Sequence, residues 1–428
     1  MMNDVTAKVA SIISKAPLPD GDPSTVLTTM KSQALDLPGA QVLDDKSPDG
    51  ITIKSTPFNA AQYAPDGKFG QVFVFERDTG DTRLFFVWVP PYLIDGIRKD
   101  NVDGRFNFHV LFHPPTYEEC YKNTPYWDGA CTRWQGEGCD DTMQDKPLYL
   151  KLGLRYLSTD FRAIAQHFSA GAGPLVPNLM YVVPVADIKN FSDLVQPPVL
   201  MTVLGEIIEG VVSAILNRPV SFRASSAVGK IVISGYSRSG TRLPALFSSL
   251  ASEKVFFTEH LNQVNAFDIV LGEQSDEKIY DLWLAMMSWR RAYPNAGIAI
   301  YSAYATPAGR MLREGPGARL LTTRKDVNFE TVTWTDPKPP LGAVRGSGFE
   351  ASSSDGRVRV ILIPISFFKL YIINNSGPIQ NPRGYDHKKT GHFHGHGWFL
   401  RSLMSHALSI AAAEPGLYAK RPPAAPGP

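Results

Sequence analysis

The sequence is poor in cysteine and close to electrically neutral. Its 428 residues include three cysteines, and the formal net charge is +2. Cys120, Cys131 and Cys139 fall in one expected loop without metal-ligand spacing, and an odd number cannot form a closed disulfide framework. We therefore expect three reduced thiols, or one local disulfide if the protein is exported. The small net charge gives no reason to expect nucleic acid or an anionic membrane as a partner.

Two features of membrane-directed chains are also missing. No uninterrupted apolar run approaches the length of a membrane helix, so no transmembrane segment is predicted. The first residues, MMNDVTAKVASIISKAPLPDGD, contain neither a basic start nor a continuous apolar stretch, so no secretory signal is expected. A cytoplasmic location is favoured on this ground, and secretion stays open if the sequence is a mature form.

The pattern of apolar residues predicts a strand hairpin followed by alternating strands and helices. Two β-rich runs at 71–75 and 83–89 flank a loop in which Gly80 occupies a position that needs a positive φ. The remaining expected strands are 107–112, 179–184, 231–235, 266–271, 297–301 and 358–364; the expected helices are 154–168, 199–216, 242–252, 278–292 and 398–412. This order predicts an α/β fold, in which a mostly parallel eight-stranded sheet has helices on both faces and an N-terminal antiparallel hairpin.

Composition divides the chain around this pattern. Residues 1–67 are polar and turn-rich and are expected to form an N-terminal arm or partial cap. The α/β domain is expected at 68–415, with insertions at about 115–153 and at 305–356, the second of which is expected to be irregular. The Pro-rich end, 416–428, is expected to be disordered.

The most informative motif is the segment KIVISGYSRSGTRLP, residues 230–244. A β-branched run ends in Gly235-Tyr236-Ser237-Arg238-Ser239, and a helix-compatible segment follows. Small residues two positions before and after a serine are what a sharp, strained strand-to-helix turn requires. Such a turn lifts the Ser237 hydroxyl clear of the backbone and predicts a nucleophile. Ser239 is a rival nucleophile, and an ordinary Gly/Ser turn is the non-catalytic interpretation.

The whole arrangement resembles the α/β-hydrolase superfamily, in particular its serine esterases and lipases. The resemblance covers roughly 68–415 and is carried by the Ser237 motif, by the His113-Pro114 that ends the third strand, and by a histidine-rich loop before the last helix. The family places its nucleophile after strand five, its acid after strand six or seven, and its histidine after strand eight. No single motif identifies a subfamily.

A serine nucleophile needs a histidine base. The loop GHFHGHGWF, 391–399, lies where the family's histidine belongs. His396 is the first choice, because His396-Gly397-Trp398 looks like the His-x-Trp found before the final helix of some esterases. His394 is second and His392 third. The alternation His-x-His-x-His could instead bind a metal, since these side chains would share one face of an extended strand.

The acid and the oxyanion hole are less well marked. After the sixth strand, Glu273 is the first candidate for the acid and Asp276 the second, either of which could instead cap the next helix. Asp386 is a weaker candidate in the histidine loop. The backbone N–H of Arg238 is the first oxyanion donor. Pro114 and Pro115 have no N–H, so the second donor is expected from the backbone or the hydroxyl group of Thr116 or Tyr117.

These residues predict an esterase that acts on a small ester or acyl substrate without a cofactor or metal. Acyl transfer, thioester cleavage and peptide cleavage would use the same triad. A binding protein that keeps the fold without a working triad is the non-enzymatic alternative. The natural substrate and the oligomeric state are not determined by the sequence.

Overall fold

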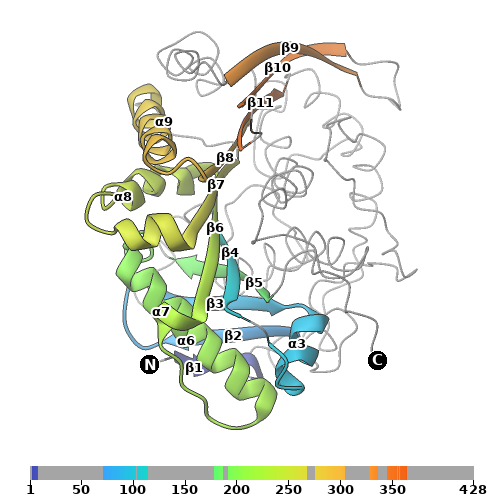
Figure 1. Cartoon of the computed structure of the whole chain (residues 1–428), viewed down its shortest axis with the longest axis vertical. Helices are drawn as coiled ribbons and strands as arrows, with labels where there is room; N and C mark the ends of the chain where they lie inside the picture. The colour runs from blue at the N-terminus through green and yellow to red at the C-terminus, as the bar shows by residue number, and fades with distance from the viewer. Residues whose placement is uncertain are drawn as a thin grey trace, which may run out of the picture.

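A computed structural model shows a mixed β-sheet with helices packed against it (Figure 1). It describes residues 2–7, 71–102, 104–113, 178–186, 191–267, 275–303, 327–335, 345–353, 355 and 357–363. The sheet has eleven strands in the order β1-β2-β3-β5-β4-β6-β7-β8-β11-β10-β9. The strands are β1 Met2–Asp4, β2 Gln71–Arg77, β3 Thr82–Val89, β4 Phe106–Phe112, β5 Leu179–Ala186, β6 Val228–Tyr236, β7 Leu261–Phe267, β8 Gly297–Ala303, β9 Val327–Thr335, β10 Arg345–Ser353 and β11 Val358–Ile363. The helices are α3 Pro91–Arg98, α6 Pro197–Leu216, α7 Ala224–Ala227, α8 Leu243–Phe247 and α9 Ser275–Ala292.

The centre of the sheet is parallel. Strands β5, β4, β6, β7, β8 and β11 are neighbours and run in one direction. The antiparallel β1, β2 and β3 continue the sheet at one edge, and β10 and β9 continue it at the other. The predicted α/β class, with an antiparallel N-terminal hairpin, is therefore confirmed at this level.

The predicted number of eight strands is too low. The eight expected strands are β2 to β8 and β11, and β1, β9 and β10 are additional. The prediction of an irregular region at 305–356 is wrong where β9 and β10 lie. The sequence of β10, RGSGFEASS, is rich in glycine and serine, which have low strand propensity, so pairing with its neighbours on both sides rather than local preference makes it a strand.

The strand β7 begins earlier than predicted. The expected strand was 266–271, whereas β7 is Leu261–Phe267. Asn262, Gln263 and Asn265 made the first half of this segment look like a loop, although all three are buried. The helix expected at 242–252 is also shorter, because α8 ends at Phe247.

One face of the sheet, here called the helix face, is packed against α6, α8 and α9 (Figure 1). Along each strand, every second side chain points to the helix face, as strand geometry requires. They form one apolar cluster with the helices, and α3 joins the same cluster beside α6. The central members on the strands are Phe108, Val110, Phe112, Ile231, Ile233, Val264 and Ala266. The helices expected at 154–168 and 398–412 lie outside the described residues.

The longest helix, α6, starts with two prolines and ends at Asn217, whose φ of 51° is left-handed. Both are favourable terminal residues, since proline suits the first helical turn and asparagine tolerates the left-handed region. At Gly210, a Cβ would lie 2.6 Å from a ring carbon of Phe75 in β2, so glycine lets the helix approach the sheet closely. By length and composition alone α6 would also suit a membrane span. Its buried stripe faces the sheet, as in the core helix of a globular domain.

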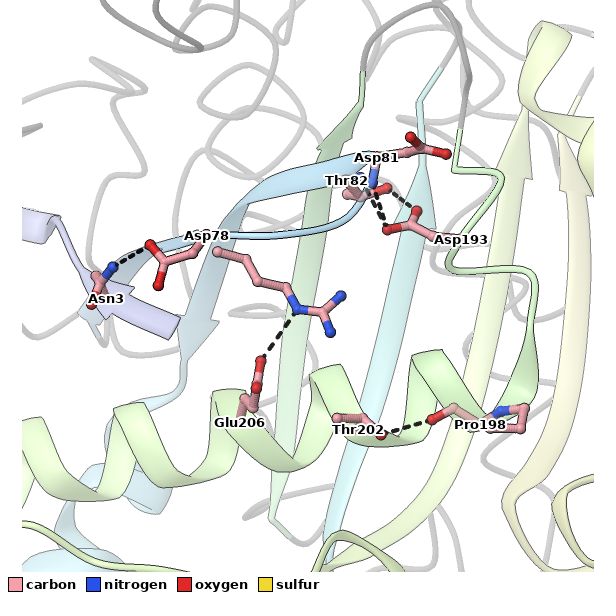
Figure 2. Close-up of polar contacts among 9 residues, drawn as sticks. Asn3, Asp78, Asp81, Thr82, Asp193, Pro198, Thr202 and Glu206 are labelled. Carbon is pink, nitrogen blue, oxygen red and sulfur yellow. Dashed lines mark hydrogen bonds and ion pairs between the residues drawn. The ribbon is translucent and has the colours of Figure 1, made fainter. Parts of the chain in front are cut away.

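Polar contacts attach the β2–β3 hairpin to the segment before α6 (Figure 2). The carboxylate of Asp193 accepts hydrogen bonds from the backbone N–H groups of Asp81 and Thr82, both at 3.1 Å, and from the Thr82 hydroxyl at 2.6 Å. The predicted positive φ of Gly80 is confirmed at 99°, and a Cβ there would lie 2.8 Å from the Asp193 carboxylate. The hairpin is therefore fixed against the helix that covers it.

Candidate active site

Ser237 is a non-glycine residue in the left-handed backbone region, with a φ of 57°. It follows the last residue of β6 and opens a short 3-10 helix, Ser237–Arg242, which leads into α8. This conformation costs an L-residue on the order of 1–3 kcal/mol and persists only where the surrounding structure enforces it. The strained strand-to-helix turn predicted around Ser237 is present.

Packing leaves little room at position 235. A Cβ on Gly235 would lie 3.0 Å from Cδ1 of Leu243 and 3.5 Å from Cα of Gly240. The helical segment after the turn thus lies directly against the strand before it. A larger side chain at position 235 would have to displace the side chain of Leu243.

Ser239, the rival nucleophile, is occupied by structural hydrogen bonds. Its side chain is fully buried. Its Oγ accepts from the Tyr236 N–H at 2.7 Å and lies 2.7 Å from the Phe112 carbonyl and 2.8 Å from the Tyr236 carbonyl. Ser237 differs, since no other residue in the described part of the chain hydrogen-bonds to its hydroxyl. The hydroxyl of Ser239 is therefore committed to holding the backbone, whereas that of Ser237, which is 4 % exposed, is not.

The position of Ser237 in the sheet is one that favours ligand binding. The chain passes from β4 to β5 on one side and then returns to β6 on the other side of β4, so the strand order reverses at β4. In open α/β sheets, ligands bind outside the carboxyl ends of the strands at such a reversal. The ends of β4 and β6 are neighbours there, with Phe112 opposite Gly235. Ser237 is two residues further along.

A second strained residue, from the segment between β5 and α6, packs beside the end of β4. Phe191 has a φ of 63°, which is unusual for a bulky side chain. Its ring stacks on Phe112, with centroids 4.7 Å apart, and meets the edge of the His113 ring at 5.0 Å. His113, which directly follows β4 as predicted, is fully buried. Strained backbone conformations cluster at functional sites, and here two of them flank the carboxyl ends of β4 and β6.

A serine–histidine hydrogen bond is found elsewhere, on the face of the sheet opposite the helices. His109 Nε2 lies 2.6 Å from Ser234 Oγ, which also accepts from Asn265 Nδ2 at 2.9 Å. Gln263 donates to Asn265 Oδ1 at 2.6 Å. We call these four residues, His109, Ser234, Asn265 and Gln263, the polar face. They extend across β4, β6 and β7.

The polar face is fully enclosed in the protein interior. The Ser234 oxygen can accept from Asn265 and also exchange a hydrogen bond with His109 Nε2, whose direction depends on the tautomer of the imidazole. Burial lowers the pKa of His109 to about 3, so the ring is neutral at neutral pH. His109 and Ser234 are both 0 % exposed, as expected for a buried structural network. This group was not predicted from the sequence, although polar residues at alternate positions of otherwise apolar strands were its signal.

The other predicted site residues are only partly covered by the structure. The backbone of Arg238 follows Ser237 in the 3-10 helix, and Asp276 lies in the first turn of α9. Their side chains are not described. His396, His394, His392, Glu273, Asp386, Thr116 and Tyr117 lie outside the described residues. Within the described part of the chain there is no cluster of three or more His, Cys, Asp or Glu side chains that could hold a metal.

The comparisons with known proteins returned no match to a family model, to a curated protein or to a solved structure. The function of this chain is therefore inferred from the geometry around Ser237.

Proposed function

We propose that this chain is a serine hydrolase that cleaves carboxylic esters through an acyl-enzyme on Ser237. The observation that carries the proposal is the left-handed backbone of Ser237 between β6 and a helical turn. This conformation is uncommon and costly for a non-glycine residue. A serine held in it between a strand and a helical turn is what a nucleophile elbow requires, which supports the proposal.

The order of strands supports an α/β-hydrolase type of fold. Counted across the sheet from β2, the strand before Ser237 is the fifth, as in the family that the sequence resembles. In this order β7 is the sixth strand and precedes Glu273 and Asp276 in the sequence, and β11 is the eighth and precedes the histidine loop. Along the chain, β9 and β10 are inserted before β11. This order is compatible with the positions that the resemblance implies for the triad.

The proposed reaction proceeds in two steps. Ser237 Oγ attacks the acyl carbon while His396, or His394 in its place, takes the hydroxyl proton and returns it to the leaving alkoxide. Glu273 or Asp276 orients the imidazole, and the Arg238 N–H stabilises the oxyanion. Water, deprotonated by the same histidine, then attacks the acyl-enzyme and releases the carboxylic acid. Acyltransferase, thioesterase and peptidase activities would share the first step and differ in the acceptor or leaving group.

The experiment compares the wild type with Ser237→Ala, using p-nitrophenyl acetate and butyrate as substrates. We expect the variant to lose at least about 10⁴-fold in kcat, in line with removal of a catalytic serine. Ser248→Ala is the matched control, because this exposed hydroxyl near α8 only bonds the Ala245 carbonyl. It should retain full activity.

A fluorophosphonate probe separates the enzyme from the alternative of a binding protein, which the two prolines after His113 favour. The enzyme should be labelled at Ser237, and the label should be absent in Ser237→Ala. Equal turnover in the wild type and in Ser237→Ala, or no labelling of folded wild type, would refute the proposal. Competing alcohol or amine acceptors in the assay then distinguish hydrolysis from acyl transfer.

A further inference from the structure

The Ser239 hydroxyl links the ends of two strands at the place where their backbone pairing stops. The last paired residues of β4 and β6 are Phe112 and Gly235. One residue later, the Tyr236 N–H donates to Ser239 Oγ at 2.7 Å, and this Oγ lies 2.7 Å from the Phe112 carbonyl. The hydroxyl therefore accepts from one strand and donates to the other, with the Tyr236 carbonyl at 2.8 Å sharing the same proton.

This hydrogen-bonded link is expected to be rigid. Ser239 and Phe112 are both fully buried, so water cannot replace the bonds. The link lies directly beside the proposed nucleophile. Tyr236 precedes Ser237, and Arg238 lies between Ser237 and Ser239.

We propose that Ser239 is a positioning residue that holds the Arg238 N–H, the first oxyanion donor, in place. The inference depends on the proposed function, because it assumes that the Arg238 N–H binds the oxyanion. Ser239 is fully buried and does not touch the substrate. Its hydroxyl ties the turn that carries Arg238 to the end of β4, so that the Arg238 N–H keeps a fixed position and direction.

Two substitutions distinguish a positioning role of the Ser239 hydroxyl from a simple need for a small residue at this position. In Gly-x-Ser-x-Gly the position of Ser239 is a glycine, so Ser239→Gly satisfies the steric need for a small residue and removes only the hydroxyl. Ser239→Ala does the same with less change in backbone freedom. If position 239 only has to be small, both variants will behave as the wild type.

The control is Ser234→Ala. Ser234 is also a buried serine of β6, and its hydroxyl also bridges to the neighbouring strands, but through the side chains of His109 and Asn265 rather than through the main chain at the strand ends. The control should lose thermal stability without changing the geometry of the oxyanion donors.

The measurement is the ratio of hydrolysis rates for a p-nitrophenyl ester and its thiono analogue, in which sulfur replaces the carbonyl oxygen. Sulfur is larger and a weaker acceptor, so this ratio reports how well the donors fit an oxyanion. For Ser239→Ala and Ser239→Gly we expect kcat on the oxygen ester to fall on the order of 10-fold, part of the loss seen on removing one donor, with KM nearly unchanged. The thiono rate should change much less, so the ratio falls.

Three outcomes separate the claims. A lower ratio in both Ser239 variants and an unchanged ratio in Ser234→Ala supports the inference. An unchanged ratio in folded Ser239→Gly and Ser239→Ala, with an active wild type, overturns it. A wild type that neither hydrolyses the ester nor takes the fluorophosphonate label overturns the proposed function instead.

Discussion

The helix face and the four residues of the polar face are both buried, but different interactions hold them. On the helix face, Phe108, Ile231 and Val264 pack against the helices in a single apolar cluster. On the polar face, the same strands β4, β6 and β7 place a hydrogen-bonded chain, from His109 to Gln263, at less than 2 % exposure. The same three strands therefore contribute to an apolar cluster on one side and to a buried hydrogen-bond network on the other.

The difference indicates what each face contributes. Apolar packing is non-directional and stabilises the domain roughly in proportion to the area buried. A buried hydrogen-bonded chain contributes less net free energy, but it is satisfied in only one arrangement of its partners. Ser234 pairs with Asn265 in the ladder between β6 and β7, so a slip of this register would break the hydrogen bond between their side chains. We infer that the helix face stabilises and the polar face fixes the register beneath Ser237.

The largest effect is expected on the helix face. Phe108→Ala should lower the free energy of unfolding by about 3–5 kcal/mol, because it removes a fully buried ring and leaves a cavity. Phe222, which is 38 % exposed, is the control. Phe222→Ala should cost less than about 1 kcal/mol. Urea unfolding measures both, and comparable losses would contradict the assignment of the helix face as the main source of stability.

A smaller effect is expected on the polar face. Asn265→Leu should cost about 1–3 kcal/mol, since it leaves the amide of Gln263 and the hydroxyl of Ser234 short of a partner. Asn262 is a matched control three positions earlier on β7, because among the described residues its buried Nδ2 has no hydrogen-bond partner. Asn262→Leu should be neutral or stabilising. If both variants lose the same stability in denaturant titration, the hydrogen-bonded chain has no special role.

The last effect is absent at neutral pH and appears only on acidification, as a pH dependence of stability. The pKa of His109 is about 3 when folded and near 6.5 when unfolded, so the unfolded chain binds a proton that the folded chain refuses. Stability should therefore fall as the pH drops below about 6.5, with a slope of up to ~1.4 kcal/mol per pH unit from this group.

His109→Gln tests this slope, since it removes the titrating ring and keeps a side-chain acceptor for Ser234. The loss of stability between pH 6.5 and pH 4 should be shallower in this variant than in the wild type. A residual slope is expected, because burial also lowers the pKa of His260. Identical profiles for the two proteins in unfolding titrations would show that His109 is not buried in neutral form.

Local sequence signals predicted some features well. The hairpin loop needed a positive φ, and Gly80 has it; a sharp turn at Ser237 needed small neighbours, and Gly235 and Ser239 are small. These features depend on a few consecutive residues, so short-range sterics determine them. The prediction was wrong for strands whose polar side chains form hydrogen bonds with residues far away in the sequence. The start of β7 was missed because Gln263 and Asn265 look like loop residues until Ser234 and His109 are placed beside them.

The sequence by itself determined the alternation of strands and helices and the strained serine turn, because periodicity and backbone sterics act over a few neighbouring residues. Only the tertiary structure decided the strand order around β4, the role of Ser239 and the polar interior. Those features join residues more than a hundred positions apart, and no local pattern records which distant carbonyl, hydroxyl or imidazole will complete a buried hydrogen bond.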